Sequence, residues 1–206
     1  MPATKRTTTI SEQATARTAK KQAIAKAQAV APAVPVRIGS TPRTVFRGNT
    51  DIFGRLVADH DRHRALLSMI AETSPRAPER AILFKELSLE LQSHAAAEEQ
   101  ALWSSVMRNP DTTDHARHAV AEHKEIDEML ADLAARDMQT PAWIRRFKVL
   151  HDEYLHHIAE EEQEQFVAAE KTLSTTDLRY MKQVFNRRKK EEKASTTITK
   201  KIQLKK

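Results

Sequence analysis

The segment LQSHAAAEEQALW, residues 91–103, decides the fold. Its apolar residues recur at steps of three and four, which is the period of an amphipathic helix. His94 and Glu98 fall on the same stripe, so both side chains point to one face of the helix, about 6 Å apart. A buried imidazole or carboxylate is costly unless another group satisfies it. The segment therefore predicts a helix that carries polar groups into a core.

Residues 156–166, HHIAEEEQEQF, repeat this arrangement. Two overlapping pairs have the same four-residue spacing: His157 with Glu161, and His156 with Glu160. The apolar neighbours Tyr154 and Ile158 favour the first pair, and the second pair remains the alternative register.

Single histidines interrupt the apolar stripes of two more segments. His60 lies in DIFGRLVADHDRHRALL, residues 51–67, and His123 lies in AEHKEIDEML, residues 121–130. His63 lies on the first of these stripes as a weaker inward candidate. The remaining histidines fall off the stripes, and we expect their side chains to be exposed: His115, His118, His151 and His156.

Prolines divide the middle of the chain into helical segments. Four segments with helical periodicity are expected, at about residues 50–72, 79–108, 112–137 and 141–171. No segment alternates with period two, so the expected fold is all-α. Four helices joined by short loops predict an up-down-up-down four-helix bundle.

The bundle is expected to occupy residues 49–173, between a disordered basic tail at 1–48 and a basic helix and tail at 174–206. This additional fifth helix should end near residue 193. Asp111 or Thr113 is the expected N-cap of the third helix, and Thr140 should precede the fourth.

The composition excludes several classes of protein. The 206 residues contain no cysteine, which excludes disulfides, iron–sulfur clusters, thiolate zinc sites and cysteine nucleophiles. No glycine follows position 54, so a Gly-rich phosphate loop of the Rossmann or P-loop kind is not expected beyond it. No apolar run reaches roughly 18 residues, so we expect a cytoplasmic protein without a transmembrane helix or a membrane partner.

The polar groups on the four stripes point to a metal site. Two His/Glu pairs and two single histidines, one set on each helix, can converge on one point of the bundle. Neutral imidazoles and carboxylates together suit a pair of first-row transition metal ions, which the carboxylates can bridge. Iron, manganese and zinc all accept these ligands.

These segments resemble the hemerythrin-like, HHE cation-binding family over roughly residues 50–172. The resemblance implies a four-helix bundle with a non-heme centre of two iron ions, bridged by an oxo or hydroxo group. It also implies the metal ligands, with Glu98 and Glu161 as the bridging carboxylates. The implied ligands are His60, His94, Glu98, His123, His157 and Glu161.

The third helix departs from the pattern of oxygen-carrying hemerythrins, which have an HxxxH there. Asp127 stands at the second position. His63, Glu122, Asp127 or water could fill the gap. This departure favours a protein that reacts with or senses oxygen, peroxide or nitric oxide over a reversible oxygen carrier, and it leaves catalysis and sensing as alternatives.

The charge distribution supports a second hypothesis. Residues 1–50 carry a net charge of +8, residues 51–175 carry −10, and residues 176–206 carry +8. The basic ends could bind nucleic acid or another anionic partner weakly, with the bundle as a scaffold, and such binding would weaken steeply with salt. The sequence indicates no oligomeric state.

Overall fold

The computed structural model describes Thr18, Gln22 and residues 44–74 and 76–203, with side chains placed up to residue 195. Apart from Thr18 and Gln22, the tail expected at 1–48 lies outside the described residues up to position 43. The described part contains helices and no strand. The elements are α2 (Ile52–Ala71), α3 (Pro78–Glu98), η1 (Glu99–Trp103), α4 (Ser104–Val106), α5 (Pro110–Ala134), α6 (Pro141–Glu160), η2 (Glu161–Gln165), α7 (Phe166–Glu170) and α8 (Thr175–Gln203).

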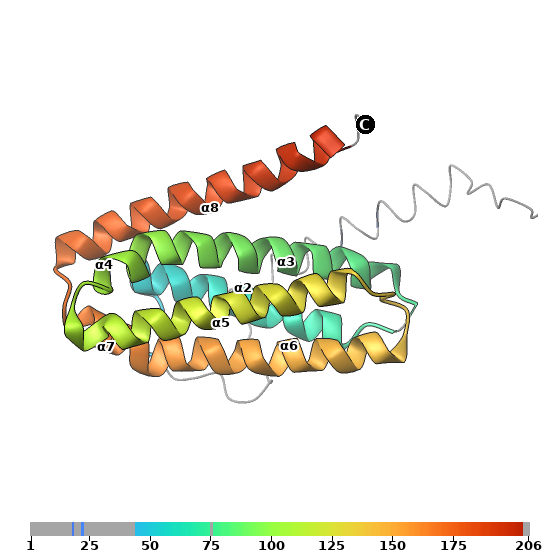
Figure 1. Cartoon of the computed structure of the whole chain (residues 1–206), viewed down its shortest axis with the longest axis horizontal. Helices are drawn as coiled ribbons and strands as arrows, with labels where there is room; N and C mark the ends of the chain where they lie inside the picture. The colour runs from blue at the N-terminus through green and yellow to red at the C-terminus, as the bar shows by residue number, and fades with distance from the viewer. Residues whose placement is uncertain (1–17, 19–21, 23–43, 75, 204–206) are drawn as a thin grey trace, which may run out of the picture.

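Four long rods form the predicted all-α bundle (Figure 1). The π-helical turns η1 and η2 join α3 to α4 and α6 to α7, so each of these runs is one continuous rod. Around the bundle, α2 contacts α3 and α6, and α5 contacts the same two helices. Because short loops join neighbours, consecutive rods run antiparallel.

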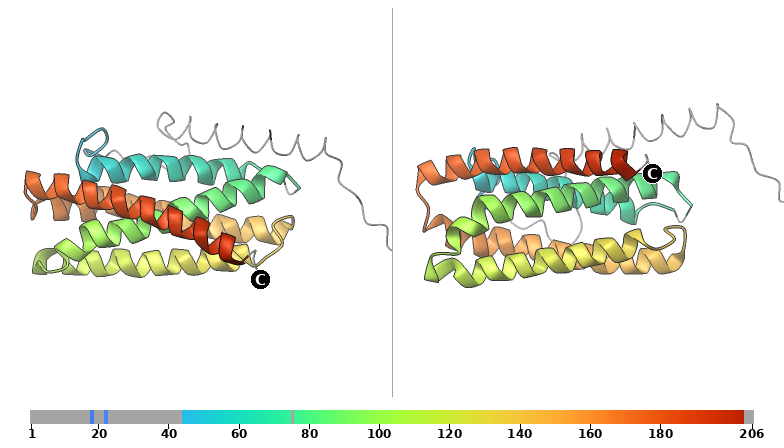
Figure 2. Two further views of the ribbon diagram at one scale, coloured as in Figure 1. Left: turned by 90° about the horizontal axis from the view of Figure 1, so that it is seen from above. Right: turned by 45° about the horizontal axis from the view of Figure 1, so that its top comes forward.

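The fifth helix, α8, packs across α3 and α2 on one side of the bundle (Figure 2). Leu178, Met181, Val184 and Phe185 on one face of α8 are buried. The helix continues to Gln203, so the expected end near residue 193 was wrong. Its apolar face explains the packing, although its overall composition is basic.

Capping residues fix the starts of the helices. The Asn109 side chain accepts a hydrogen bond from the backbone N–H of Asp111, and Pro110 occupies the first turn of α5. The prediction of Asp111 or Thr113 as the N-cap was therefore wrong. Thr140 caps α6 as predicted, accepting from the N–H of Trp143.

Buried apolar side chains form two separate clusters along the bundle. One includes Phe53, Trp103 and Phe185, and the other includes Leu87 and Trp143. On each rod, buried histidines and carboxylates lie between the residues of the two clusters. The bundle therefore holds a polar layer between two hydrophobic cores.

Phe46 extends the first cluster beyond the expected start of the bundle. Its ring is fully buried and lies 4.8 Å from the ring of Phe53 and 6.1 Å from that of Phe166, between centroids. The packed part of the chain thus includes residues that we had assigned to the N-terminal tail.

Among the described residues, no helix is both long enough and apolar enough to cross a bilayer. A cytoplasmic location stays a prediction.

Candidate metal centre

The structure brings the six predicted ligands together in the polar layer. All six side chains are buried, with at most 4% of any residue exposed. They come from all four rods, because the stripe of each rod faces the bundle axis at the same depth. The six are His60 on α2, His94 and Glu98 on α3, His123 on α5, His157 on α6, and Glu161 at the start of η2.

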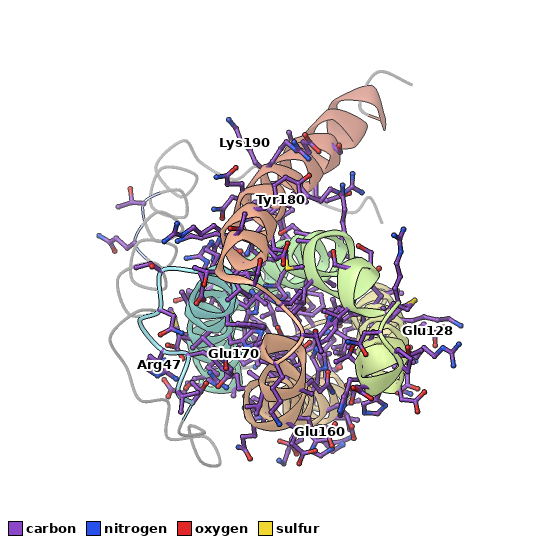
Figure 3. All side chains as sticks on the ribbon, turned by 90° about the vertical axis from the view of Figure 1, so that its left-hand side faces the viewer. Arg47, Glu128, Glu160, Glu170, Tyr180 and Lys190 are labelled. Atoms are coloured by element: carbon purple, nitrogen blue, oxygen red, sulfur yellow. The ribbon has the colours of Figure 1, made fainter. Side chains whose placement is uncertain are left out.

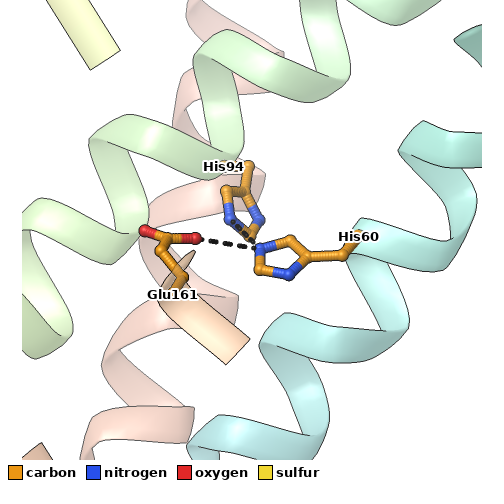
Figure 4. Close-up of side chains that lie close together, drawn as sticks. All are labelled: His60, His94 and Glu161. Carbon is orange, nitrogen blue, oxygen red and sulfur yellow. Dashed lines mark hydrogen bonds and ion pairs between the residues drawn. The ribbon is translucent and has the colours of Figure 1, made fainter. Parts of the chain in front are cut away.

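His60, His94 and Glu161 form one half of the layer (Figure 4). His60 Nε2 lies 3.3 Å from His94 Nε2 and 3.4 Å from Glu161 Oε2. Three potential ligand atoms from three different rods therefore surround one point.

His123 and His157 form the other half, again with Glu161. Their Nε2 atoms lie 4.0 Å and 3.6 Å, respectively, from Glu161 Oε1. Glu161 thus directs one oxygen to each half. Such a placement suits a carboxylate that bridges two cations.

Glu98 spans the two halves from the opposite helix. Its Oε2 lies 3.4 Å from His94 Nε2 and 3.6 Å from His123 Nε2. Each predicted bridging glutamate therefore contacts histidines of both halves.

A second layer of carboxylates lies behind the histidines and faces their Nδ1 atoms. Glu162 lies 2.8 Å from His60, Asp59 lies 3.2 Å from His94, Glu99 lies 2.9 Å from His123, and Glu122 lies 2.8 Å from His157. Each of these carboxylates is the sequence neighbour of a predicted ligand on another rod. Partners of this kind fix the tautomer and ring orientation of a metal-binding histidine. The sequence predicted the helix on which each of these carboxylates lies. It did not predict which histidine each carboxylate contacts.

The carboxylates of this second layer determine which nitrogen of each histidine ring carries the hydrogen. An ionised carboxylate only accepts hydrogen bonds, so Nδ1 of His60 and His94 must donate. In a neutral ring, the lone pair then lies on Nε2. The two Nε2 atoms face each other at 3.3 Å, an arrangement that a cation between them would satisfy.

The buried glutamate oxygens of the polar layer also lack the partners that a cation would supply. Both side-chain oxygens of Glu98 and of Glu161 are buried without a hydrogen-bond partner, as is Nε2 of His123. Buried polar atoms in native proteins are nearly always satisfied. The donor set of imidazole nitrogens and carboxylate oxygens fits a pair of transition metal ions.

Burial and neighbouring charges set the protonation of the layer. Burial lowers the pKa of His60 to about 4 and also lowers the pKa of His157, so both rings are neutral. Burial opposes the charged form of His123, but the neighbouring carboxylates of Glu98 and Glu99 raise its pKa to about 9. Burial and the charge of Glu98 raise the pKa of Glu161 well above its ordinary value. Without a metal, His123 therefore holds a proton at neutral pH, and Glu161 keeps its proton to a higher pH than an ordinary glutamate does.

Both glutamates on the ligand stripes adjoin a π-helical turn. η1 begins one residue after Glu98, and η2 begins at Glu161. The wider turn allows the consecutive residues Glu161 and Glu162 both to point inward, and both are buried. Such turns are frequent at functional sites.

The structure also resolves the alternatives left by the sequence. His157 and Glu161 point inward, whereas His156 is exposed and Glu160 lies on the outside of the bundle (Figure 3). His151 is buried rather than exposed, and its Nδ1 lies 2.8 Å from a side-chain oxygen of Asp152.

Three side chains were candidates for the position that Asp127 leaves without a histidine. Glu122 contacts His157, and Asp127 is exposed. His63 is fully buried, and its Nε2 has no hydrogen-bond partner, while its Nδ1 lies 2.7 Å from the Tyr154 hydroxyl. Only His63 among the three combines burial with a free ring nitrogen.

Helix α8 contacts the centre from outside the bundle. The Phe185 ring meets the His94 ring edge-on at 5.5 Å between centroids. Lys189 is buried, donates a hydrogen bond to Asp59, the carboxylate behind His94, and forms an ion pair with Glu90 at 2.9 Å. The sequence predicted a basic helix here but gave no indication of this contact.

Comparison with known families agrees with this geometry. The sequence model of the hemerythrin HHE cation-binding domain matches residues 51–169. The chain belongs to this family. The HHE domain thus comprises the four rods and the polar layer, and α8 lies beyond the matched residues.

A solved structure shares the fold of this HHE domain. It is a hemerythrin HHE cation-binding domain-containing protein from Mycobacterium kansasii, with 20% sequence identity and a TM-score of 0.65. The alignment covers 73% of this chain and 91% of the other. A search of curated protein sequences gave no match.

Proposed function

We propose that this HHE domain holds two iron ions and reacts with or senses oxygen, peroxide or nitric oxide. His60 and His94 would hold one ion, His123 and His157 the other, and the two glutamates would bridge them. The observation that carries this proposal is the set of buried, unpartnered oxygens of Glu98 and Glu161, each glutamate facing histidines of both halves.

When bound, such an iron pair supplies two electrons to a small oxidant without a protein radical. The carboxylates behind the histidines orient the rings, and the apolar clusters on both sides exclude water. A cavity of about 10 Å³ lies beside His94, His123 and Tyr154. This space is at most that of about one water molecule, so larger substrates are excluded without movement of the lining side chains.

The Tyr154 hydroxyl forms a hydrogen bond with the His63 side chain within this site. Burial raises the pKa of its hydroxyl well above the ordinary value, so the group remains protonated. His63 Nδ1 lies 2.7 Å from this oxygen. The pair gives Tyr154 a fixed position one turn before His157, at the edge of the cavity.

Metal analysis with an optical spectrum tests the proposal. Protein purified aerobically should contain two irons per chain and absorb in the near ultraviolet as a bridged ferric pair does. His94→Ala and Glu161→Ala should lose iron while the helical signal in circular dichroism is largely kept. His115→Ala, which changes a histidine outside the polar layer, should retain the iron. Zero or one metal per chain in the unaltered protein would exclude a dinuclear centre.

Nucleic-acid binding through the basic ends stays the second prediction. Several cations of α8 make intramolecular contacts: Lys182 with the Thr50 carbonyl, Lys189 with Asp59, and Lys193 with Glu90. These contacts leave fewer charges for phosphate groups. Removal of residues 1–43 should therefore eliminate most salt-dependent DNA binding if the ends act this way, and unchanged affinity would exclude a role for the N-terminal end.

A further inference from the structure

A second cluster of histidines and glutamates lies on the outer face of α5 and α6. It contains the pair that the buried centre does not use, His156 and Glu160, opposite His118 and Glu122. His118 Nε2 lies 3.1 Å from Glu160 Oε2 and 3.5 Å from Glu122 Oε1. His156 Nε2 lies 3.4 Å from the other oxygen of Glu160. Both helices thus contribute a His/Glu pair with four-residue spacing to one place.

Protein groups alone satisfy this arrangement poorly. His118 Nε2 faces two carboxylates, but a neutral ring can offer only one hydrogen at that nitrogen. The ligand atoms of His118, Glu122 and Glu160 all lie within 4.8 Å of one another, so the two carboxylates repel each other. A divalent cation would bind all three atoms and offset this repulsion.

We propose that His118, Glu122 and Glu160 form a second metal site, which binds one exchangeable divalent transition metal ion. One imidazole and two carboxylates are ligands that zinc, iron(II), cobalt(II) and manganese(II) accept. His118 is exposed and Glu160 half-buried, which leaves room for water at the remaining positions. The site is independent of the function proposed for the buried centre.

Glu122 connects this surface site to the buried layer. Its Oε1 faces His118, and its Oε2 lies 2.8 Å from His157 Nδ1. The surface ion would therefore lie one carboxylate away from a ligand of the buried centre. This placement offers an incoming ion a first contact on the side of the molecule closest to His157.

A cobalt titration tests this site on the full chain with its buried metal as purified. Cobalt(II) gives visible absorption bands that report its ligands, and calorimetry gives the number of ions bound. We expect one additional ion per chain. His118→Ala and Glu160→Gln should each weaken its binding by about tenfold or more, and His115→Ala on the same helix should not change it. Absence of the additional ion, or equal binding in His118→Ala, would overturn the proposal.

The two sites can be distinguished with one more variant. His94→Ala should lower the tightly held iron and leave the weak cobalt site intact. The iron content of His118→Ala should match that of the unaltered protein. If His94→Ala abolished cobalt binding while His118→Ala kept it, the cobalt would occupy the buried layer, and the surface assignment would be wrong.

Discussion

Lys189 on α8 forms a buried ion pair with Asp59 on α2, through the same carboxylate oxygen that faces His94. Burial alone would raise the pKa of Asp59, but the hydrogen bond to His94 and the charge of Lys189 lower it well below its ordinary value. The fifth helix thereby helps to keep the carboxylate behind His94 ionised.

Replacement of Lys189 tests this connection. Lys189→Met leaves Asp59 with Arg55, and Glu90 with Arg62 and Lys193, so its cost should stay below about 3–5 kcal/mol, the cost of a buried charge left without a partner. We expect a lower free energy of unfolding in urea and weaker metal binding. Lys190→Met, at the exposed neighbouring position, is the matched control (Figure 3). Equal stability of the two variants would contradict a structural role for the pair.

Metal binding should depend on pH. His123 has a pKa of about 9 and holds a proton at neutral pH without a metal, and burial with the charge of Glu98 raises the pKa of Glu161 well above its ordinary value. A cation needs both groups deprotonated, so its binding releases any proton that they hold. Affinity should rise with pH until about pH 9, the pKa of His123. Competition with a chelator at several pH values measures this, and a constant affinity would disprove the assignment.

The carboxylates behind the histidines should control metal affinity. Glu162→Gln places an amide beside His60 Nδ1, and the amide N–H can favour the tautomer whose hydrogen points to the centre. We expect about 10- to 100-fold weaker metal binding, the range for partners of metal-binding histidines. Glu164→Gln, an exposed change in the same turn, is the control. Equal affinities of the two variants would show that Glu162 does not orient His60.

Phe46 should contribute to the stability of the bundle. Phe46→Ala removes a fully buried ring and should lower the free energy of unfolding by about 3–5 kcal/mol. Val45→Ala, at a residue that is 78% exposed, should have little effect. Denaturant unfolding followed by circular dichroism compares them, and a loss below that of Val45→Ala would place Phe46 outside the folded unit.

The four rods and the inward direction of the six predicted ligands followed from the sequence, because both depend on local periodicity. His94 and Glu98 share a face for the same reason that their helix forms. The contacts between rods could not be predicted in this way. Asp59 and Glu162 reach histidines on other helices only after the bundle has assembled.

Two features of the structure that we did not predict have a recognisable origin in the local sequence. The step from Glu161 to the next buried apolar residue, Phe166, is five residues, which is the spacing of a π-helical turn. Asn109 precedes Pro110, a pattern typical of a helix start, whereas the apolar stripe used to place the helix begins only at Ala116. By contrast, the position of α8 on the bundle depends on contacts between residues far apart in the sequence: Phe185 with His94, and Lys189 with Asp59.

The division of the apolar side chains into two clusters has a mechanical consequence. The two apolar clusters hold the rods together on either side of the polar layer. Apolar packing between the rods is weakest in that layer, where carboxylates and imidazoles replace apolar side chains. If the polar layer holds metal as proposed, removal of the metal should increase hydrogen exchange in the middle of the bundle before it does so in the two apolar clusters.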